Sequence, residues 1–548
     1  MASETHVQLS GSNRRRDLAA LQIGKVDLKE EITITIGLRG PRLPGPNEFV
    51  GQRFKPEELE EKFGARDPDV NKVKEFLNKY DLEVEEPLLA ARSMRVSGTA
   101  KAMERAFKPD WAIMRSPGQG DYRGRQGTIY IPAELKGIVT GVYGLDKRRM
   151  AFRRSGAAAP AGAGTAKRSL TPKKIERLYK FPAGDGEGQS IAIAQFGGGF
   201  FEDDLIAYCN RFRKSTPKVQ RVPVGAPAYT LRDILNLRDP DLRKAKLEQS
   251  FEVMMDVEII GGLCPKASIS VYFSTLDQSG WVNLLDKVIT ADPTPVALSI
   301  SWGFAEDDKQ WSRNAIRAIN DRLNIARLLG ITTCVASGDD GWKCGVVDDD
   351  FGHVDFPSCS PFVMGVGGTM LLQSGKEVAW NEVPATDVDG HKYGGGASGG
   401  GVSGYFQRPA WQKNVQVSPL NKKKFKGRVV PDVSALAGEP YYYFRFLDMD
   451  WPEGKTSASA PVWAALIARI NAKLLPEKQQ RFLTPLLYKE LAKGISVGKA
   501  SCRNIEIGNN AVYHCHPGNG YKAGRGFDAV TGWGVPDGKK LLECLAKI

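Results

Sequence analysis

Two patterns of hydrophobic residues alternate along the first 150 positions. Apolar and polar side chains alternate in three short segments, as they do in half-buried strands: EITITIGLRG (31–40), SMRVSGT (93–99) and GTIYIP (127–132). Apolar residues recur at helical spacing in three further segments: DVNKVKEFLNKYDL (69–82), AKAMERAF (100–107) and AELKGIVTGVYGL (133–145). This order predicts a small α+β domain made of two βαβ halves, which is a ferredoxin-like arrangement.

The chain after residue 172 has a different pattern, because its strands are apolar on both faces. Four such strands are expected: SIAIAQF (190–196), ASISVYFS (267–274), VALSISW (296–302) and ITTCVASG (331–338). Helical segments separate them. This pattern predicts an α/β domain whose parallel sheet is covered by helices on both faces. In such sheets, the functional groups lie at the carboxyl ends of the strands.

A segment without periodicity joins these two parts. RRSGAAAPAGAGTAKRSLTP (153–172) contains mostly small residues between arginine and lysine residues, which is typical of a flexible, protease-sensitive linker. We therefore expect one folded domain at 26–152 and a second at 173–548. We expect residues 1–25 to be a flexible leader. Its arginine cluster at 14–16 is not followed by the apolar segment of a Sec-type secretory signal, which does not exclude export by another route.

Composition narrows the classes of function. The net charge of +13 would suit a nucleic-acid partner, but the basic residues are dispersed and not interleaved with aromatic residues, so we expect none. No segment approaches the roughly 18–20 apolar residues of a membrane span, so we expect no membrane partner. Eight cysteines in 548 residues are too few for a disulfide scaffold, and none forms a CxxC pair. The spacings of Cys344/Cys359 and Cys502/Cys515 suit either disulfides or free thiols.

The stretch DWPEGKTSASAPVWAALIARIN (450–471) permits two interpretations. A phosphate-binding P-loop needs glycine five positions before Gly454, but Met449 stands there between two aspartates. The other interpretation makes Ser457 a nucleophile at the start of a helix, where free amides and the helix dipole stabilise a developing anion. Pro461 would then lie in the first turn, where its missing N–H costs nothing. A plain helix cap by Thr456 or Ser457 remains the alternative.

A nucleophilic serine needs a base, and histidine is the usual one. The chain has five histidines, all in the leader or in loop-like segments: His6, His353, His391, His514 and His516. Carboxylates are therefore considered. Glu252 and Asp256 are four residues apart in a helical segment, so they share one face and could share a proton; an exposed acidic face is the alternative. Asp339 follows a buried strand and could donate to an oxyanion when protonated, or simply form a turn.

Taken together, these segments resemble the sedolisin, or serine-carboxyl peptidase, family, and most closely a kumamolisin-like proenzyme. The resemblance covers nearly the whole chain. It is carried by these motifs in this order: GIVTGVYGLDKR (137–148), EVMMD (252–256), SISWG (299–303), SGDDG (337–341), HVDFPSCSP (353–361), SGGGVS (398–403), VVPDVSA (429–435), TSASAP (456–461) and AGRGFDAVTGWGVPDG (523–538). It implies a subtilisin-like parallel sheet preceded by an activation domain and a cleavable linker.

The resemblance also implies roles for single residues. Ser457 is similar to the family's nucleophile, Glu252 to its general base and acid, Asp256 to the carboxylate that supports the base, and Asp339 to the oxyanion-stabilising acid. Carboxylate catalysis of this kind implies an acidic working pH. The residues expected to bind substrate are Ser301, Trp302, Gly303 and Asp355, of which Asp355 could favour basic or polar side chains.

The family also carries a calcium site near the C-terminus. By position, the ligands to one calcium ion would be Asn504, Ile505, Gly524, Gly526 and Asp528, and oxygen ligands of this kind suit calcium. Asn504 stands where the family usually has aspartate, so the resemblance implies a weakened site. A hydrogen-bonded turn without metal is the alternative.

Two further positions depart from the family. Gln195 stands where kumamolisin-like enzymes have a glutamate behind the base, although its neighbour Trp302 is kept. Lys455 replaces the glycine that normally precedes the Thr-Ser pair. Neither change removes a member of the expected catalytic set, but the first could shift the pH optimum.

The resemblance therefore implies a secreted, monomeric, acid-active endopeptidase that cleaves polypeptides. It would be made as a self-processing zymogen, with its own activation domain as intramolecular inhibitor. Two alternatives stay open. One is a pseudo-peptidase that binds peptides or proteins without cleaving them, and the other is a neutral serine hydrolase that uses a histidine such as His353.

Overall fold

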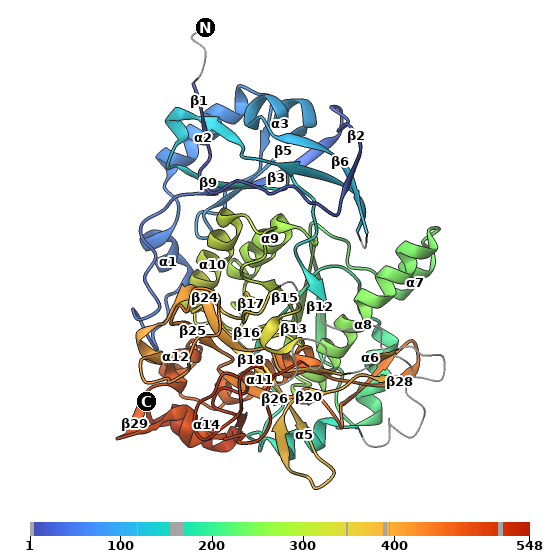
Figure 1. Ribbon diagram of the computed structural model, residues 1–548, viewed down its shortest axis with the longest axis vertical. Coiled ribbons are helices and arrows are strands. Elements are labelled where there is room, and N and C mark those ends of the chain that lie inside the picture. The colour runs from blue at the N-terminus through green and yellow to red at the C-terminus, as the bar shows by residue number, and fades with distance from the viewer. Residues whose placement is uncertain are drawn as a thin grey trace.

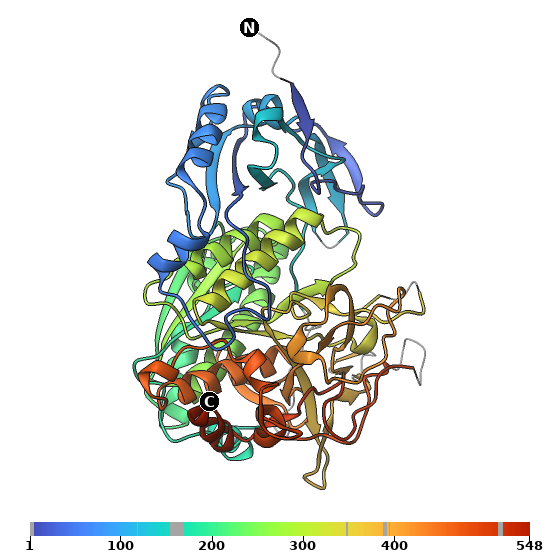
Figure 2. The same cartoon turned by 90° about the vertical axis from the view of Figure 1, so that its left-hand side faces the viewer.

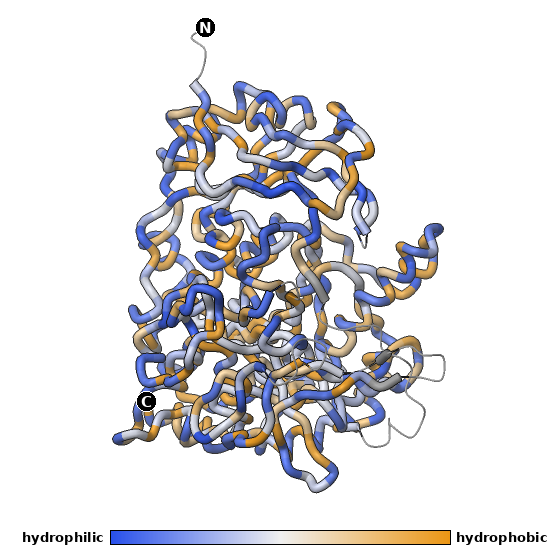
Figure 3. The backbone as a smooth tube through the Cα atoms, in the orientation of Figure 1, coloured by the Kyte–Doolittle hydropathy of each residue, from blue (hydrophilic) through white to orange (hydrophobic). Residues whose placement is uncertain are grey.

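The computed structural model describes residues 5–117, 119–153, 169–346, 349–386, 392–393, 395–512 and 519–548. It has two parts, with the N-terminal domain lying on top of a larger domain in Figures 1 and 2. Figure 3 shows hydrophobic stretches in both parts, and each part has its own buried core. Within the described residues, no helix is long and apolar enough to cross a membrane.

The larger domain is built on an eight-stranded sheet. Its strands, in spatial order, are β12 (Lys218–Val224), β13 (Ser268–Ser274), β11 (Ser190–Gln195), β14 (Ala297–Ile300), β16 (Thr332–Ala336) and β18 (Met364–Leu371), and β18 also pairs with β26 (Val433–Leu436) and β19 (Glu377–Ala379). All pairs are parallel except β18–β19. The expected parallel α/β sheet is confirmed.

Helices cover both faces of this sheet because its strands are apolar on both sides. In β11, Ile191 and Ile193 point into one core cluster, while Ala192 and Ala194 point into the other. The first cluster contains α8 (Pro240–Leu263) and α11 (Lys455–Asn471), which pack against each other. The second contains α9 (Gln278–Ile289) and α10 (Arg313–Leu328), which lie beneath the N-terminal domain in Figure 1.

The N-terminal domain has a four-stranded antiparallel sheet in the order β4 (Glu83–Val84), β5 (Ser93–Thr99), β3 (Glu31–Leu38) and β9 (Val139–Tyr143). The helices α2 (Asp67–Asn78) and α3 (Ala100–Phe107) pack on it. The helix expected at 133–145 is wrong, because 133–135 form a 3-10 turn and Val139–Tyr143 form strand β9. The free edge of β3 and two β-branched valines favour a strand there, and Gly141 disfavours a helix.

The expected flexible leader at 1–25 also differs from the structure. Strand β1 (His6–Gln8) pairs with β8 (Tyr130–Pro132), and β2 (Leu21–Gly24) pairs with β6 (Asp110–Ser116). Between them, Arg14 is buried and forms an ion pair with Asp146, with 2.8 Å between Nε and Oδ2. These long-range contacts make residues 6–24 part of the N-terminal domain.

One extended segment of the N-terminal domain, residues 41–54, runs down the larger domain, and we call it the strap (Figure 2). It lies between β3 and α1 (Pro56–Phe63). The amide of Phe54 donates to the carbonyl of Leu328 at 2.8 Å, and the buried side chains of Asn324 and Arg327 donate to strap carbonyls. The two domains are therefore joined by main-chain contacts as well as by the linker.

Candidate active site

Ser457 is the third residue of α11, in the first turn, and Gly454 is the N-cap residue of this helix. Its side chain is fully buried, and its Oγ has no hydrogen-bond partner in the part of the chain that the structure describes. Pro461 lies inside the helix, in the second turn rather than the first. Its missing N–H leaves the Ser457 carbonyl without a helical donor, and the Ser301 hydroxyl lies 3.2 Å from that oxygen instead.

The turn before the helix is tightly constrained. A Cβ atom on Gly454 would lie 2.0 Å from the carbonyl oxygen of Ala437, so only glycine fits there. The amide of Lys455 donates to that same carbonyl at 2.6 Å. Lys455 has φ +66°, a left-handed conformation that costs an L-residue about 1–2 kcal/mol. The positive φ explains why glycine suits position 455, although this chain has lysine there.

The acidic pair lies in the buried half of α8, one turn apart. Glu252 and Asp256 are both fully buried, which excludes the alternative of an exposed acidic face. Burial and the negative charge of Glu252 raise the pKa of Asp256 well above its usual value. The pair therefore holds a proton at a pH where exposed carboxyls have lost theirs.

A chain of hydrogen bonds orients Asp256. Trp302 Nε1 donates to Gln195 Oε1 at 3.0 Å, which turns the amide nitrogen of Gln195 toward Asp256 Oδ2 at 2.8 Å. The hydroxyl of Ser301 lies 3.1 Å from Asp256 Oδ1. Gln195 and Ser301 come from the carboxyl ends of the adjacent strands β11 and β14, as expected for this class of sheet.

Asp339 follows the next strand, β16, and is held at the start of α11. Its Oδ1 accepts from the amide of Thr456 at 3.0 Å and from the Thr456 hydroxyl at 2.7 Å. Thr456 Oγ1 in turn accepts from the amide of Gly338 at 3.3 Å. This positioning role of Thr456 was not predicted from the sequence, although its place beside Ser457 in TSASAP was the available signal. Asp339 and Ser457 are thus brought to one helix terminus.

His353 is not available as a base for Ser457. Its Nδ1 lies 2.9 Å from Asp307 Oδ2, and its Nε2 lies 2.9 Å from Asp349 Oδ1. Although burial lowers its pKa, the hydrogen bonds to these two carboxylates outweigh that effect and hold the pKa above its ordinary value. An imidazolium that is hydrogen-bonded at both ring nitrogens acts as a donor at each of them and has no nitrogen left to accept a proton from Ser457.

The expected substrate segment forms strand β15 (Trp302–Ala305). Strand β10 (Phe152–Arg153), at the start of the linker, pairs with it antiparallel, with Phe152 opposite Gly303 and Arg153 opposite Trp302. On its other side, β15 pairs with β17 (Asp355–Phe356). The chain leaving the N-terminal domain therefore lies as an added strand beside Trp302 and Gly303, which directly follow Ser301 in the chain.

Asp355 is buried in strand β17, where it lies opposite Ala305 of β15. The thiol of Cys344 donates to its Oδ1 at 2.9 Å, and only about 1% of the residue is exposed. Cys344 and Cys359 are both free thiols, so the disulfide alternative fails for this pair. Cys515, the expected partner of Cys502, lies outside the described residues. The influence of Asp355 on substrate preference stays a prediction.

The five residues of the expected calcium site come together in one loop region near the C-terminus. Asn504 follows β31 (Cys502–Arg503), and its side chain lies against the loop that contains Gly524, Gly526 and Asp528. Ile505, whose carbonyl was the fifth expected ligand, follows Asn504 and is buried. No group of three or more His, Cys, Asp or Glu side chains suited to a metal occurs within the described part of the chain.

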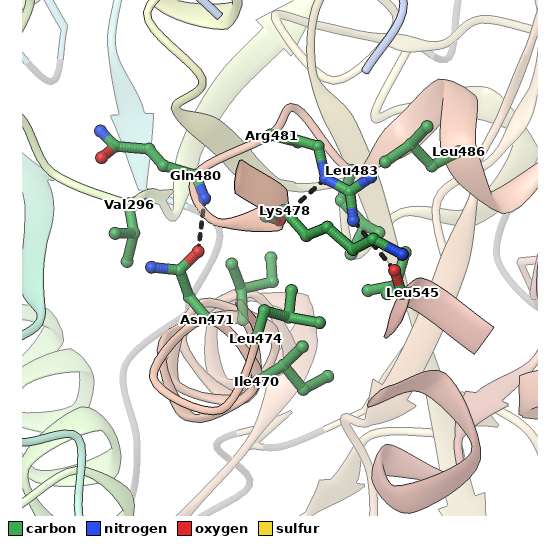
Figure 4. A pocket seen from close by; sticks show the side chains of 11 residues that line it. Val296, Ile470, Asn471, Leu474, Lys478, Gln480, Arg481, Leu483, Leu486 and Leu545 are labelled. Atoms are coloured by element: carbon green, nitrogen blue, oxygen red, sulfur yellow. Dashed lines mark hydrogen bonds between the residues drawn. The ribbon is translucent and has the colours of Figure 1, made fainter. Parts of the chain in front are cut away.

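A separate pocket lies at the opposite end of α11 from Ser457 (Figure 4). Its cavity of about 30 Å³ is lined by Val296, Ile470, Leu474 and Leu486 beside Lys478 and Arg481. Asn471 accepts from the amide of Gln480, and Arg481 donates to the carbonyl of Leu545. A cavity of this size holds about one water molecule, so it is no substrate site.

Comparisons with known proteins agree with this arrangement. Residues 20–148 match the family model "Pro-kumamolisin, activation domain". The chain is 33% identical to kumamolisin of Bacillus sp. (strain MN-32), with 98% of this chain and 96% of that protein aligned. It is 27% identical to tripeptidyl-peptidase sed5 of Aspergillus fumigatus over 98% of this chain and 97% of that protein.

Among solved structures, Pseudomonas sedolisin, a serine-carboxyl proteinase, superposes with a TM-score of 0.55 at 25% identity. It matches 69% of this chain and 97% of that one. The fold, the buried serine and these relatives together define a serine-type peptidase that carries an N-terminal activation domain. The chain belongs to the sedolisin family, and it is a kumamolisin-like proenzyme within it.

Proposed function

We propose that this protein is an acid-active endopeptidase that processes itself from a zymogen. The observation that carries the proposal is the buried pair Glu252–Asp256 on α8, which packs against α11, the helix whose first turn contains Ser457. Glu252 is the general base, because His353 is engaged at both ring nitrogens. A base of this type remains effective at a pH where an imidazole would be protonated.

The reaction follows from these groups. Glu252 takes the proton of Ser457 as its Oγ forms a bond to the substrate carbonyl carbon, and the carbonyl becomes an oxyanion. Asp339, protonated, donates a hydrogen bond to that oxyanion. Glu252 then gives the proton to the leaving amine as the C–N bond breaks, which leaves an ester on Ser457. Water then attacks the ester carbon as Glu252 takes a proton from it, and the C–O bond to Ser457 breaks as Glu252 returns this proton to Ser457 Oγ.

Asp256 sets the charge of the buried Glu252–Asp256 pair. The pair works with one shared proton, so that Glu252 is ionised while Asp256 is neutral. Gln195 and Ser301 hold the Asp256 carboxyl in one orientation. Loss of the shared proton at higher pH ends activity, which gives the enzyme its acidic range.

Pairing of β10 with β15 supports both endopeptidase action and self-processing. Strand β10 is an internal segment of the chain, because the N-terminal domain precedes it and the larger domain follows it. A cleft that accepts such a segment does not require a free N-terminus. In this state, the activation domain blocks the cleft, and cleavage within the linker releases it. Polypeptides are the substrates, and secretion is proposed from the family alone.

The decisive experiment compares wild type with Ser457→Ala and Glu252→Gln at about pH 3–4. Digestion of a denatured protein by wild type, and its loss in both variants with unchanged thermal unfolding, supports the proposal. A folded wild type that binds peptides without cleaving them would make it a pseudo-peptidase. Peptides with a blocked N-terminus distinguish endopeptidase from tripeptidyl-peptidase action. A tripeptidyl-peptidase, the activity for which the Aspergillus relative is named, would leave such peptides intact.

A further inference from the structure

The side chain of Asn504 occupies the centre of the loop that the family resemblance assigns to calcium. Its Nδ2 donates to the carbonyl of Gly524 at 3.1 Å and to the carbonyl of Gly526 at 2.9 Å. Its Oδ1 accepts from the amide of Gly526 at 2.9 Å. Both hydrogens of the amide group thus point at two of the carbonyl oxygens that were expected to bind the ion.

The carboxylate of Asp528 is equally engaged. Its Oδ1 accepts from the amides of Val530 and Thr531 at 2.9 and 2.8 Å. Its Oδ2 accepts from the amide of Gly524 at 3.1 Å and lies 3.2 Å from the Thr531 hydroxyl. Four donors therefore converge on the one carboxylate in this set, and they hold the loop closed without a cation.

This donor set does not fit calcium. Calcium takes six to eight oxygen ligands whose lone pairs converge on the ion. Here the oxygens of Gly524 and Gly526 face N–H groups of Asn504, and a cation between them would have to displace both hydrogens. With asparagine in place of aspartate, the set also holds one carboxylate instead of two, and Arg525 lies between the two glycines.

We infer that the Asn504 amide replaces the calcium ion, so that this protein's C-terminal loop is closed by hydrogen bonds and does not depend on metal. The amide crosslinks the same two carbonyls that an ion would bridge, and its oxygen adds a third bond. Asparagine serves here because it alone combines an N–H₂ group with an acceptor at this side-chain length.

The closed loop matters for the catalytic region. The carbonyl of Val530 accepts from Ser398 Oγ at 2.7 Å. Next to it, the amide of Ala397 donates to the carbonyl of Asp339 at 2.7 Å. The loop therefore supports the segment on which the oxyanion residue rests, and metal independence of the loop extends to the integrity of the site.

The inference is tested by thermal unfolding and calorimetry on the full chain in a Ser457→Ala background, which prevents self-digestion. With Asn504 present, we expect the unfolding midpoint in 5 mM calcium and in excess EDTA to agree within about 1 °C, and titration with calcium chloride to release no binding heat. Asn504→Asp removes the two N–H donors and restores the second carboxylate. It should bind one calcium ion and gain about 2 °C or more in calcium.

Two further variants complete the design. Asn504→Ala loses all three hydrogen bonds and should unfold at a lower temperature with and without calcium, since it restores no ligand. Asn236→Asp, on the exposed end of α7 (Leu231–Leu235), adds the same charge elsewhere and should not respond to calcium. A single calcium site in the Asn504 protein that Asn504→Ala abolishes would overturn the inference. So would an Asn504→Asp protein that folds but binds no calcium.

Discussion

Retention of the cleaved activation domain should depend on Arg327, a buried residue of α10. Its Nη1 donates to the carbonyl of Glu48 at 2.8 Å, and its Nη2 donates to the carbonyls of Pro44 and Gly45 at 3.1 and 2.9 Å. Burial lowers its pKa to about 10, so it stays charged throughout the acidic and neutral range. The guanidinium of Arg327 therefore anchors the strap by hydrogen bonds to three main-chain carbonyl oxygens, at acidic and at neutral pH alike.

The size of the effect follows from these three bonds. A hydrogen bond from a charged donor contributes about 1.5 kcal/mol net at the lower end of its range, so the loss of three in Arg327→Ala should weaken the contact by about 4 kcal/mol. Since 1.4 kcal/mol is a factor of ten, the activation domain should dissociate roughly 1,000-fold faster once the linker is cut. Water that reaches the freed carbonyls would reduce this figure, and the lost packing of the arginine stem would increase it.

The assay uses the Ser457→Ala chain, cut in its linker by trypsin at the arginines and lysines that flank it. Size-exclusion chromatography at timed intervals measures how fast the N-terminal fragment leaves. Arg42→Ala is the matched control, because Arg42 pairs with Glu48 on the exposed surface of the strap, where such pairs contribute little. If the Arg327→Ala fragment dissociates within threefold of the rate of the parent protein, Arg327 does not retain the activation domain.

Two predictions concern buried acids. Gln195→Glu should move the alkaline limb of the kcat/KM profile to higher pH by about 1 unit. An ionised glutamate at 195 removes a hydrogen-bond donor from Asp256 and adds a negative charge beside it, and both changes raise the pKa of Asp256. Gln220→Glu, at an exposed position, is the control, and a Gln195→Glu profile that coincides with that of the wild type would contradict this role of Gln195. Glu258, buried on α8 with its Oε2 accepting from the amide of Arg445 at 2.7 Å, has a pKa raised well above its ordinary value, chiefly by burial. Its folded form binds the proton more tightly than its unfolded form, so stability declines as pH rises above the unfolded value, by up to about 1.4 kcal/mol per pH unit. In the Ser457→Ala chain, Glu258→Gln should make the free energy of unfolding, measured with urea, depend less on pH between pH 5 and 8. An unchanged slope of this free energy against pH would contradict the effect of Glu258.

Much of the architecture could be predicted from the sequence because it rests on local patterns. Strands that are apolar on both faces require a sheet covered on both sides, and the structure has one. The residue types of the proposed catalytic set were also visible, since a serine at a helix start and two carboxyls four residues apart are features of local spacing. The same spacing left the burial of Glu252 and Asp256 open, and only the packing of α8 against α11 decided it.

Other features depended on partners far away in the chain. Residues 139–143 form a strand because β3 offers an edge, and residues 6–24 are ordered because β6 and β8 pair with them. The strap contacts with Arg327 and the added strand β10 have no local signature at all.

Single side chains show the same division most clearly. The amino-acid sequence is enough to tell that Asn504 and Gln195 are amides where the family resemblance implies acids, and that Lys455 replaces a glycine. The folded chain is needed to tell that Asn504 donates to Gly524 and Gly526 and that Gln195 donates to Asp256. A hydrogen bond depends on where its acceptor lies, and the acceptor of a buried group comes from a distant part of the chain.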